Sequence, residues 1–343
     1  MNFEGTVYEN FDWRLLTELY SSGSNNSGGA SIRDAYIGAK AFDWLQLRVG
    51  RMKSPIGIER WQSASARWFT DLATTTYLVP NRENGAMLWG NVSQGLLEYY
   101  AGIFNGAPDG GSSNFSMSGQ NTKDFEGRLA VKPFANMDID GLEKLLVGAG
   151  VTYAPQLNGL GSYDTVNQQT FFEYSSSTIE ATSSNPGEQV RFVPNASYFW
   201  GPFGLYAEAA WSTVGVSAPG YSTNLTNFGW QVAASWVLTG EDNSFGAIAP
   251  RLIFDPSNGG WGALQIAARV GQLTIDPAAF PIYANPATQA SQSTTIGIGL
   301  NWILNENIKL TLEYDFTSFV GGGAGGGNRP EANAITSQFQ MFF

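Results

Sequence analysis

Apolar and polar side chains alternate along this chain with a period of two, in segments of about ten residues. In the segment 307–317, one face consists of Ile308, Leu310, Leu312, Tyr314 and Phe316. The opposite face consists of Lys309, Thr311, Glu313, Asp315 and Thr317. Successive side chains of a strand point to opposite sides of its sheet, so this pattern predicts β-strands with one apolar and one polar face.

Fifteen such segments follow one another from end to end. The pattern predicts strands at 3–9, 11–20, 32–40, 44–52, 85–92, 96–103, 125–134, 143–153, 188–200, 203–212, 226–239, 261–272, 294–304, 307–317 and 332–343. The connections alternate between short turns and long segments rich in Gly, Ser, Asn and Pro. Long connections are expected at 21–31, 53–84, 104–124, 154–187, 213–225, 273–292 and 318–331, and 240–259 is a long connection on the short-turn side. Short turns opposite long loops are typical of outer-membrane β-barrels.

The last strand adds a second indication of such a barrel. Ile335, Phe339, Met341 and Phe343 share its apolar face, which only Ser337 interrupts. The chain then stops at an aromatic carboxyl terminus. This ending resembles the closing strand of bacterial outer-membrane barrels, in which a terminal Phe is part of the assembly signal. It would place the carboxyl terminus in the periplasm.

An odd number of strands cannot close an antiparallel barrel. If the last strand runs toward the periplasm, the first of fifteen does too, and the two cannot pair antiparallel. An open edge in lipid is very costly because its backbone groups lack partners. We therefore expect sixteen strands with the first missing from this chain; fourteen is the alternative, if 3–9 is not a membrane strand. The lack of a visible signal segment likewise predicts a mature or incomplete start.

Composition narrows the possible functions. The 343 residues include no Cys and no His, and 14% are charged, against roughly 25% in soluble domains. Without His and Cys, the chain cannot be a Ser-His hydrolase, use a Cys nucleophile or bind a metal through these ligands. The net charge of −11 argues against nucleic acid as a partner. No stretch approaches the ~20 apolar residues of a transmembrane helix.

A large soluble β-sandwich or β-solenoid would also alternate. Strands of a sandwich tend to be shorter, however, and a sandwich hides its apolar face. Aromatic residues at strand ends suit the two interfacial girdles of a membrane barrel instead. They are Trp13, Trp44, Trp200, Phe203, Trp211 and Trp302.

Several segments resemble a known family. Residues 32–38 read I-R-D-A-Y-I-G, 47–53 read L-R-V-G-R-M-K, and 54–59 read S-P-I-G-I-E. They resemble the phosphate-selective porin O and P family, whose pattern reads approximately R-D-A-Y-x-G, V-G-Q-F-K and x-P-F-G-L-E. Segments 79–85, 235–241 and 259–269 resemble later parts of that pattern. The resemblance implies a sixteen-stranded trimeric porin with a long periplasmic link at 240–259. It also implies that the first strand of the barrel precedes residue 1 of this sequence.

Loop 53–84 is the best candidate for a constriction, because porins fold such a loop into the lumen. It carries Lys53, Arg60, Arg67 and Arg82 against Glu59, Asp71 and Glu83. A ring of Arg and Lys favours anions through Coulomb attraction in a narrow passage. The alternative is that these cations pair with neighbouring carboxylates and only hold the loop in place.

Strand parity places further charges on the polar faces. They are Arg14, Glu18, Lys40, Arg48, Glu98, Glu126, Arg128, Arg191, Glu208, Arg269, Lys309 and Glu313. We take Arg48, Arg128, Arg269, Lys309 and Glu313 as lumen charges, which either form a transverse field or are ordinary solvated or paired groups. The chain has only six Lys. This departs from the lysine cluster of a phosphate-specific lumen, so the prediction is a weak, phosphate-like anion preference.

The sequence thus predicts an all-β transmembrane barrel of one domain, residues 1–343, acting as an outer-membrane porin for small hydrophilic solutes. No catalytic residue, cofactor or metal is expected. Expected partners are outer-membrane lipid, lipopolysaccharide, small ions or solutes, and two further copies of the chain in a homotrimer. Acidic groups of the outer loops are either divalent-cation ligands that bridge lipopolysaccharide or a hydrated surface: Asp109, Asp124, Asp164, Glu173, Glu180, Glu188 and Asp276. The alternative function is a structural or adhesive barrel with a blocked lumen.

Overall fold

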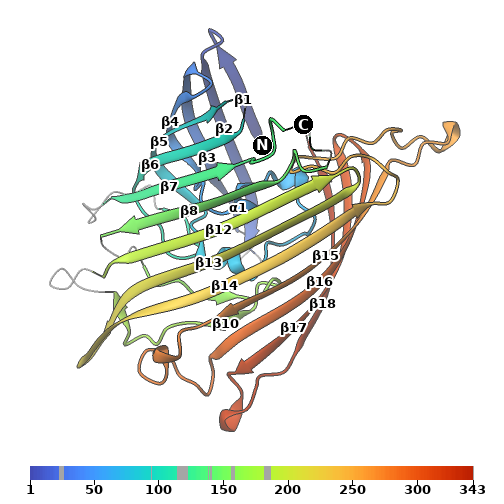
Figure 1. Ribbon diagram of the computed structural model, residues 1–343. Helices are drawn as coiled ribbons and strands as arrows, with labels where there is room; N and C mark the ends of the chain where they lie inside the picture. The colour runs from blue at the N-terminus through green and yellow to red at the C-terminus, as the bar shows by residue number, and fades with distance from the viewer. Residues whose placement is uncertain are drawn as a thin grey trace.

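The computed structural model describes residues 1–22, 27–93, 95–113, 123–137, 139, 141–155, 159–180 and 187–342. One large antiparallel sheet dominates it, and fifteen of its strands are paired in chain order (Figure 1). Their bounds are Asn2–Val7 (β1), Phe11–Ser22 (β2), Ser27–Phe42 (β3), Leu45–Lys53 (β4), Arg82–Val92 (β5), Leu97–Phe104 (β6), Asp124–Val131 (β7), Leu146–Ala154 (β8), Gln189–Trp200 (β12), Phe203–Ala218 (β13), Tyr221–Val237 (β14), Ala263–Thr274 (β15), Ala290–Asn305 (β16), Ile308–Gly321 (β17) and Ala332–Met341 (β18). All fifteen predicted strands are therefore confirmed. The predicted terminal Phe343 lies outside the described residues.

The remaining elements are short and lie in the long connections. Two of them, Tyr163–Asp164 (β9) and Thr170–Phe172 (β10), pair with each other, and Ile179–Glu180 (β11) pairs with β13. The helical turns are Ile58–Trp61 (α1), Ala64–Ala66 (η1), Thr74–Leu78 (η2), Pro256–Asn258 (η3), Pro277–Ala279 (η4) and Ala324–Gly326 (η5). No helix in the described part of the chain has the length and apolar character needed to cross a membrane.

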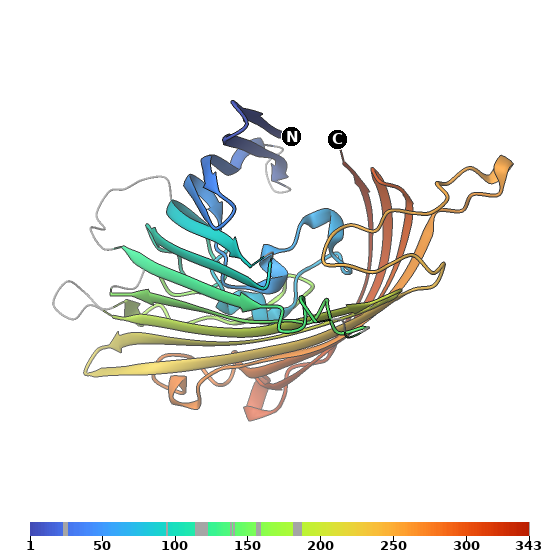
Figure 2. The same ribbon diagram turned by 45° about the horizontal axis from the view of Figure 1, so that its top comes forward.

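The sheet curls into a barrel-like wall (Figure 2). Strands β1 and β18 form its two edges, and no ladder joins them within the described residues. Fifteen strands paired antiparallel in chain order give these two edges the same direction, as the strand count predicts. One end of the wall carries the short connections and the carboxyl-terminal end of β18, and we call it the turn end. The opposite end, with most of the long connections, is the loop end.

The wall is apolar outside and polar inside. In β16, Ile296, Ile298 and Leu300 are exposed, whereas Thr295 and Asn301 are buried. The same alternation runs along β15 and β17, whose outer residues are apolar and exposed. This arrangement is the reverse of a soluble sheet and matches the face assignments made from the sequence. A surface of this kind requires an apolar surrounding medium.

Two predicted long connections are wrong. Residues 21–31 were expected to form one, but β2 continues to Ser22 and β3 begins at Ser27, and these two residues are paired. Residues 213–225 were expected to form a long loop, but the pairing of β13 with β14 continues to Ala218 opposite Tyr221. Only Pro219 and Gly220 connect the strands, and Gly220 has φ +81°. Glycine adopts this left-handed conformation without steric cost, which permits the tight turn. The hairpin therefore extends well beyond its neighbours at the loop end.

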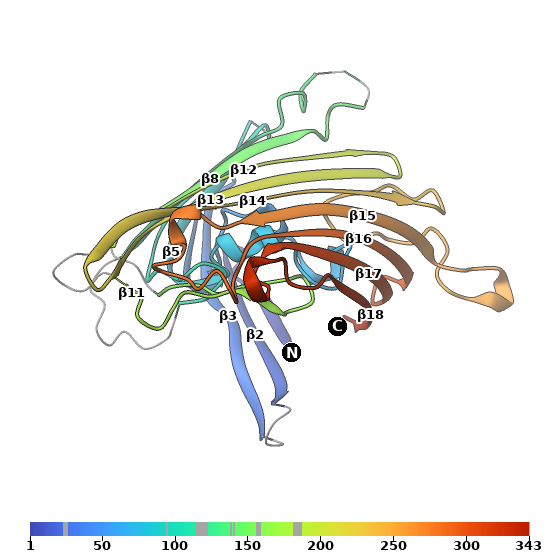
Figure 3. The same cartoon turned by 90° about the horizontal axis from the view of Figure 1, so that it is seen from below.

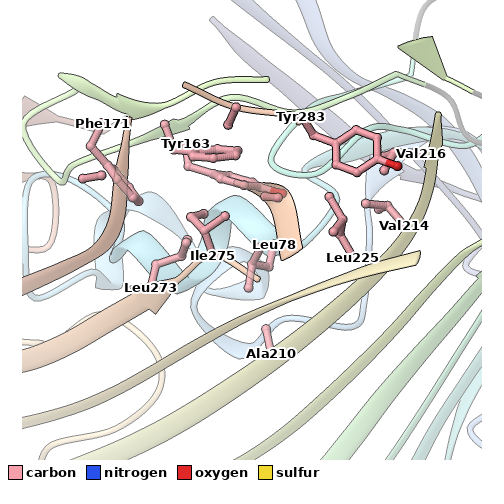
Figure 4. Close-up of a cluster of buried hydrophobic side chains, with 14 of the residues drawn as sticks. Leu78, Tyr163, Phe171, Ala210, Val214, Val216, Leu225, Leu273, Ile275 and Tyr283 are labelled. Atoms are coloured by element: carbon pink, nitrogen blue, oxygen red, sulfur yellow. The ribbon is translucent and has the colours of Figure 1, made fainter. Parts of the chain in front are cut away.

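Several long connections fold back over the inner face of β13–β16 and pack together. Their apolar side chains form the largest buried cluster, which includes Leu78 of η2, Tyr163 of β9 and Phe171 of β10 (Figure 4). Leu225 of β14, Leu273 of β15 and Tyr283 complete it from the wall side and from the connection after β15. This cluster gives the loop end an apolar core on the inner side of the wall, where three smaller apolar clusters also occur.

The connection between β14 and β15 has two parts. The first part enters the lumen, where Ile248 packs on Val237, Ala263 and Ile303. The second part, residues 251–261, projects from the wall at the turn end, as Figures 1, 2 and 3 show in orange. We call residues 251–261 the turn-end finger. The length of this connection agrees with the long segment expected at 240–259.

Candidate pore constriction

The segment between β4 and β5 crosses the concave side of the wall (Figures 2 and 3, light blue). It contains α1, η1 and η2. Backbone bonds from Trp61 N to Gly57 O (3.0 Å) and from Gln62 N to Ile58 O (3.1 Å) close the first turn. Short helical turns suit such a segment because they satisfy backbone groups locally where no strand partner is available. The segment thereby keeps an ordered backbone on the concave side of the wall.

Two buried carboxylates attach the middle of this segment to the wall. Glu59 accepts hydrogen bonds from Ala73 N (3.0 Å), from Gln231 Nε2 of β14 (2.8 Å) and from Tyr206 Oη of β13 (3.3 Å). Glu208 of β13 accepts a hydrogen bond from Ile58 N at the start of α1. The predicted site residue Glu59 is thus occupied in holding the segment rather than exposed to the passage.

Residues 65–71 are attached to the last strands of the chain. Lys309 of β17 donates to Ser65 O (3.1 Å) and Arg67 O (2.8 Å). Asn301 of β16 donates to Trp68 O (2.9 Å). Glu313 of β17 accepts from the backbone N–H of Thr70 (2.7 Å) and from its hydroxyl. The segment therefore bridges early and late strands across the lumen.

Arg60 and Arg82 have internal partners. Arg60 is buried and donates from Nε and Nη2 to Thr76 O at 3.0 and 2.8 Å. Burial lowers the pKa of Arg60 to about 10, so it stays protonated at neutral pH. Arg82 forms an ion pair of 2.8 Å with Asp34. Arg82 thus pairs with a carboxylate, as the alternative for this loop describes, whereas Arg60 is held by backbone carbonyl groups and has no ion pair among the described residues.

Lys53 and Arg67 have no ion pair with any residue that the structure describes. Lys53 Nζ donates to Gln62 O at 2.7 Å. Arg67 is partly exposed, and its buried Nε has no hydrogen-bond partner among the described residues. Burial lowers the pKa of Arg67 from its ordinary value. Arg67 also lines a hollow at the turn end together with Lys309 and Glu306. Arg60 is buried and also lacks a carboxylate partner, so Lys53 and Arg67 are the partly exposed cations of the segment without a neutralising carboxylate among the described residues.

The predicted lumen charges all lie on inner faces, but most are paired or packed. Arg269 of β15 contacts Glu313 (2.5 Å) and Asp315 (3.0 Å) of β17. Arg48 of β4 lies 4.1 Å above the Tyr36 ring and 3.6 Å from Asp12. Arg128 of β7 lies 5.7 Å from the Tyr100 ring. The structure thus agrees with the expectation of paired groups more than with an open transverse field.

Sequence reasoning missed a buried ion pair between Asp109 and Arg191 of β12, which are separated by 2.8 Å. Asp109 was expected on the surface of an outer loop, but it is buried, as is Asp124 of β7. The side chain of Glu180 lies outside the described residues. No cluster that could hold a metal ion occurs among the described acidic residues. An isolated Asp in a Gly- and Pro-rich connection carries no local signal that an Arg more than eighty positions later will reach it.

The sequence matches the family described as phosphate-selective porin O and P over residues 1–316. The chain belongs to this family. It is therefore an outer-membrane porin with a barrel fold. No curated protein sequence matches it.

Solved porin structures share the fold at low sequence identity. The channel DcaP of Acinetobacter baumannii has 11% identity and a TM-score of 0.56, covering 98% of this chain and 83% of that one. OmpF of Salmonella typhi, solved with daunomycin, has 14% identity and a TM-score of 0.58, covering 99% and 89%. An anion-selective porin from Comamonas acidovorans has 9% identity and a TM-score of 0.53, covering 99% and 88%.

Replacing Lys309 by Met is expected to loosen the constriction of the porin. The change removes both bonds from Lys309 Nζ to the loop backbone, and hydrogen bonds from charged donors contribute about 1.5–3 kcal/mol each. Open-channel current noise in a planar bilayer should rise, because residues 65–67 would fluctuate across the passage. Lys309→Arg, which keeps donors at this position, is the matched control. An unchanged noise spectrum for Lys309→Met would contradict the assigned contact.

Proposed function

We propose that this porin passes small hydrophilic solutes by passive diffusion, that loop 53–84 forms the constriction, and that the constriction favours anions. The anion preference rests on one observation, which is a difference in exposure between the basic and the acidic side chains. Lys53 and Arg67 have no carboxylate partner among the described residues, whereas Glu59, Glu208 and Glu313 are buried and accept hydrogen bonds. Asp71 is the one partly exposed carboxylate of the segment, where it accepts a hydrogen bond from Gln168 Nε2 (3.0 Å). The partly exposed charges without an ion pair therefore favour anions by one, although the chain is acidic overall.

The proposed preference is for small anions as a class. The guanidinium of Arg67, which has no ion pair among the described residues, attracts chloride, phosphate or a carboxylate by the same Coulomb interaction. The family description names phosphate, and one structural neighbour is titled an anion-selective porin. A specific phosphate site would need several convergent donors, and Lys53 already donates to Gln62 O. A weak, general preference therefore fits the charges better than a phosphate-specific one.

We propose further that the turn end faces the periplasm and that three copies assemble into a homotrimer. Short turns on one side and long loops on the other favour this orientation, because outer-membrane barrels have short periplasmic turns. The trimer rests on the family resemblance. Phospholipid on the periplasmic side and lipopolysaccharide on the outer side would then surround the exposed apolar face.

A planar-bilayer recording of the full chain in a tenfold KCl gradient tests the proposal. The reversal potential should have the sign of chloride preference and should shrink toward zero at high ionic strength, because salt screens the two cations. A reversal potential with the sign of potassium preference would refute the anion preference. If the protein inserts but conducts no current, the alternative of a structural or adhesive barrel with a blocked lumen replaces the proposal.

A further inference from the structure

The turn-end finger has a defined backbone although it projects from the wall. Phe254 N donates to Leu304 O of β16 (2.7 Å), and Gly262 N donates to Leu252 O (3.1 Å). Asp255 and Gly260 exchange two backbone hydrogen bonds of 2.9 Å each and so close a small hairpin. Figures 1 and 2 show this hairpin standing away from the ends of β14–β16. Its side chains are therefore presented in a fixed arrangement.

The base of the finger is continuous with the apolar outer surface of the wall. The Phe254 ring packs edge-on against Trp302 of β16 at 5.3 Å between centroids and against Trp261 at 6.0 Å. Trp302 Nε1 donates to Trp261 O at 2.7 Å. Trp302 shares its face of β16 with the exposed Ile298 and Leu300. The finger thus begins on the lipid side of the barrel, not in the lumen.

The finger itself is apolar along its stem and polar at its tip. Leu252, Ile253 and Trp261 are 64%, 59% and 60% exposed. The tip carries Asp255, whose carboxylate accepts hydrogen bonds from Ser257 Oγ and Asn258 Nδ2 at 2.6 Å each. Arg251 is exposed at the start of the stem and makes no side-chain hydrogen bond or ion pair with the described residues. Exposed apolar residues, a Trp and an Arg together are typical of segments that lie in a membrane interface.

We propose that the turn-end finger lies in the headgroup layer of the membrane leaflet at the turn end. Leu252, Ile253 and Trp261 would contact the upper acyl chains, and Arg251 would bind lipid phosphate groups. The polar tip would remain among hydrated headgroups. This inference needs the porin to be in a membrane but not the proposed anion preference, so either can fail without the other. With the turn end in the periplasm, the lipid is a phospholipid.

Site-directed labelling tests the position of the finger, and the absence of native Cys makes every label unique. Leu252→Cys and Ile253→Cys would each carry an environment-sensitive fluorophore in the full-length porin, reconstituted in phosphatidylethanolamine and phosphatidylglycerol vesicles. Ser257→Cys at the tip and Ile298→Cys on the outer face of β16 serve as references. Unchanged single-channel conductance shows that each variant is folded.

The labels at 252 and 253 should be quenched by lipids brominated near the glycerol, roughly twofold or more above the label at 257, as expected for shallow insertion. The label at 298 should respond best to lipids brominated deep in the acyl chains. If aqueous iodide quenches 252 and 253 as strongly as 257, and bromolipids do not, the proposal is overturned. If both positions are shielded from iodide and from bromolipids, a protein contact with a second copy replaces the lipid contact.

Discussion

Replacing Arg191 by Met is expected to destabilise the porin by about 3–5 kcal/mol, because it leaves a buried carboxylate without its cation. The side chains of Arg191 and Asp109 are 0% and 2% exposed. Asp109 also accepts hydrogen bonds from Gln189 Nε2 (2.8 Å), Ser212 Oγ (3.0 Å) and Tyr163 Oη (3.0 Å). These neutral donors cannot replace a full positive charge in a buried site. Urea unfolding in phospholipid vesicles, followed by Trp fluorescence, measures the loss.

Two variants make this expectation specific. Lys132 and Glu98 form a partly exposed ion pair of 3.3 Å, and Lys132→Met should cost about 1 kcal/mol or less, as exposed pairs do. The double variant Arg191→Met with Asp109→Leu should be more stable than the sum of its single changes predicts, because it leaves no unpaired charge. Equal losses for Arg191→Met and Lys132→Met would show that burial of the Arg191 pair carries no energetic weight.

Replacing Arg67 by Glu is expected to shift the reversal potential from anion toward cation preference. At 4 Å in water, a unit charge attracts an anion by about 1 kcal/mol. Reversing the charge changes the interaction energy of an anion by about 2 kcal/mol, which corresponds to about 30-fold in anion occupancy. The interaction energy of a cation changes by the same amount with the opposite sign. Lys53→Glu should act in the same direction. The double variant should be clearly cation-selective in a KCl gradient.

Lys144→Glu supplies the matched control for this charge reversal. Lys144 is exposed in the turn between β7 and β8, so its substitution changes net charge equally but outside the proposed passage. Its reversal potential should stay at the wild-type value. If Arg67→Glu and Lys144→Glu both leave the reversal potential unchanged, Arg67 does not border the conducting path and the constriction must be sought elsewhere.

The alternation of apolar and polar residues was sufficient to predict the strands of the wall, because the two faces of a strand can be assigned from its own residues. The faces of β15, β16 and β17 match the expectation residue by residue, since side-chain parity does not depend on distant partners. The same rule was available at Val214 and Val216, which are buried on β13. The polar residues around Val214 and Val216 obscured this alternation. The Pro219-Gly220 pair, which is typical of a tight turn, indicated that the two strands form a hairpin there.

The constriction was less predictable because its contacts are distant in sequence. Arg60 and Arg67 are equally basic and belong to the same segment. Arg60 is enclosed by carbonyl groups of Thr76 and Gly110, whereas Arg67 borders a hollow near β17. No spacing within 53–84 distinguishes them, because the difference arises from how separate connections pack. The sequence therefore predicts which loop carries the charges, but not which charges a solute can reach.

The contacts of residues 65–71 also bear on the order of assembly. Thr70 and Glu313 are 243 positions apart, and Trp68 and Asn301 are 233 apart. Most neighbouring strands of the wall, in contrast, are close in sequence, so two strands can pair as soon as both are present. Contacts that close such long stretches of chain form late, because their entropic cost is met only after the intervening chain is ordered. We therefore expect the wall to form before residues 65–71 attach to it, so that the proposed anion preference would be acquired only when β16 and β17 are in place.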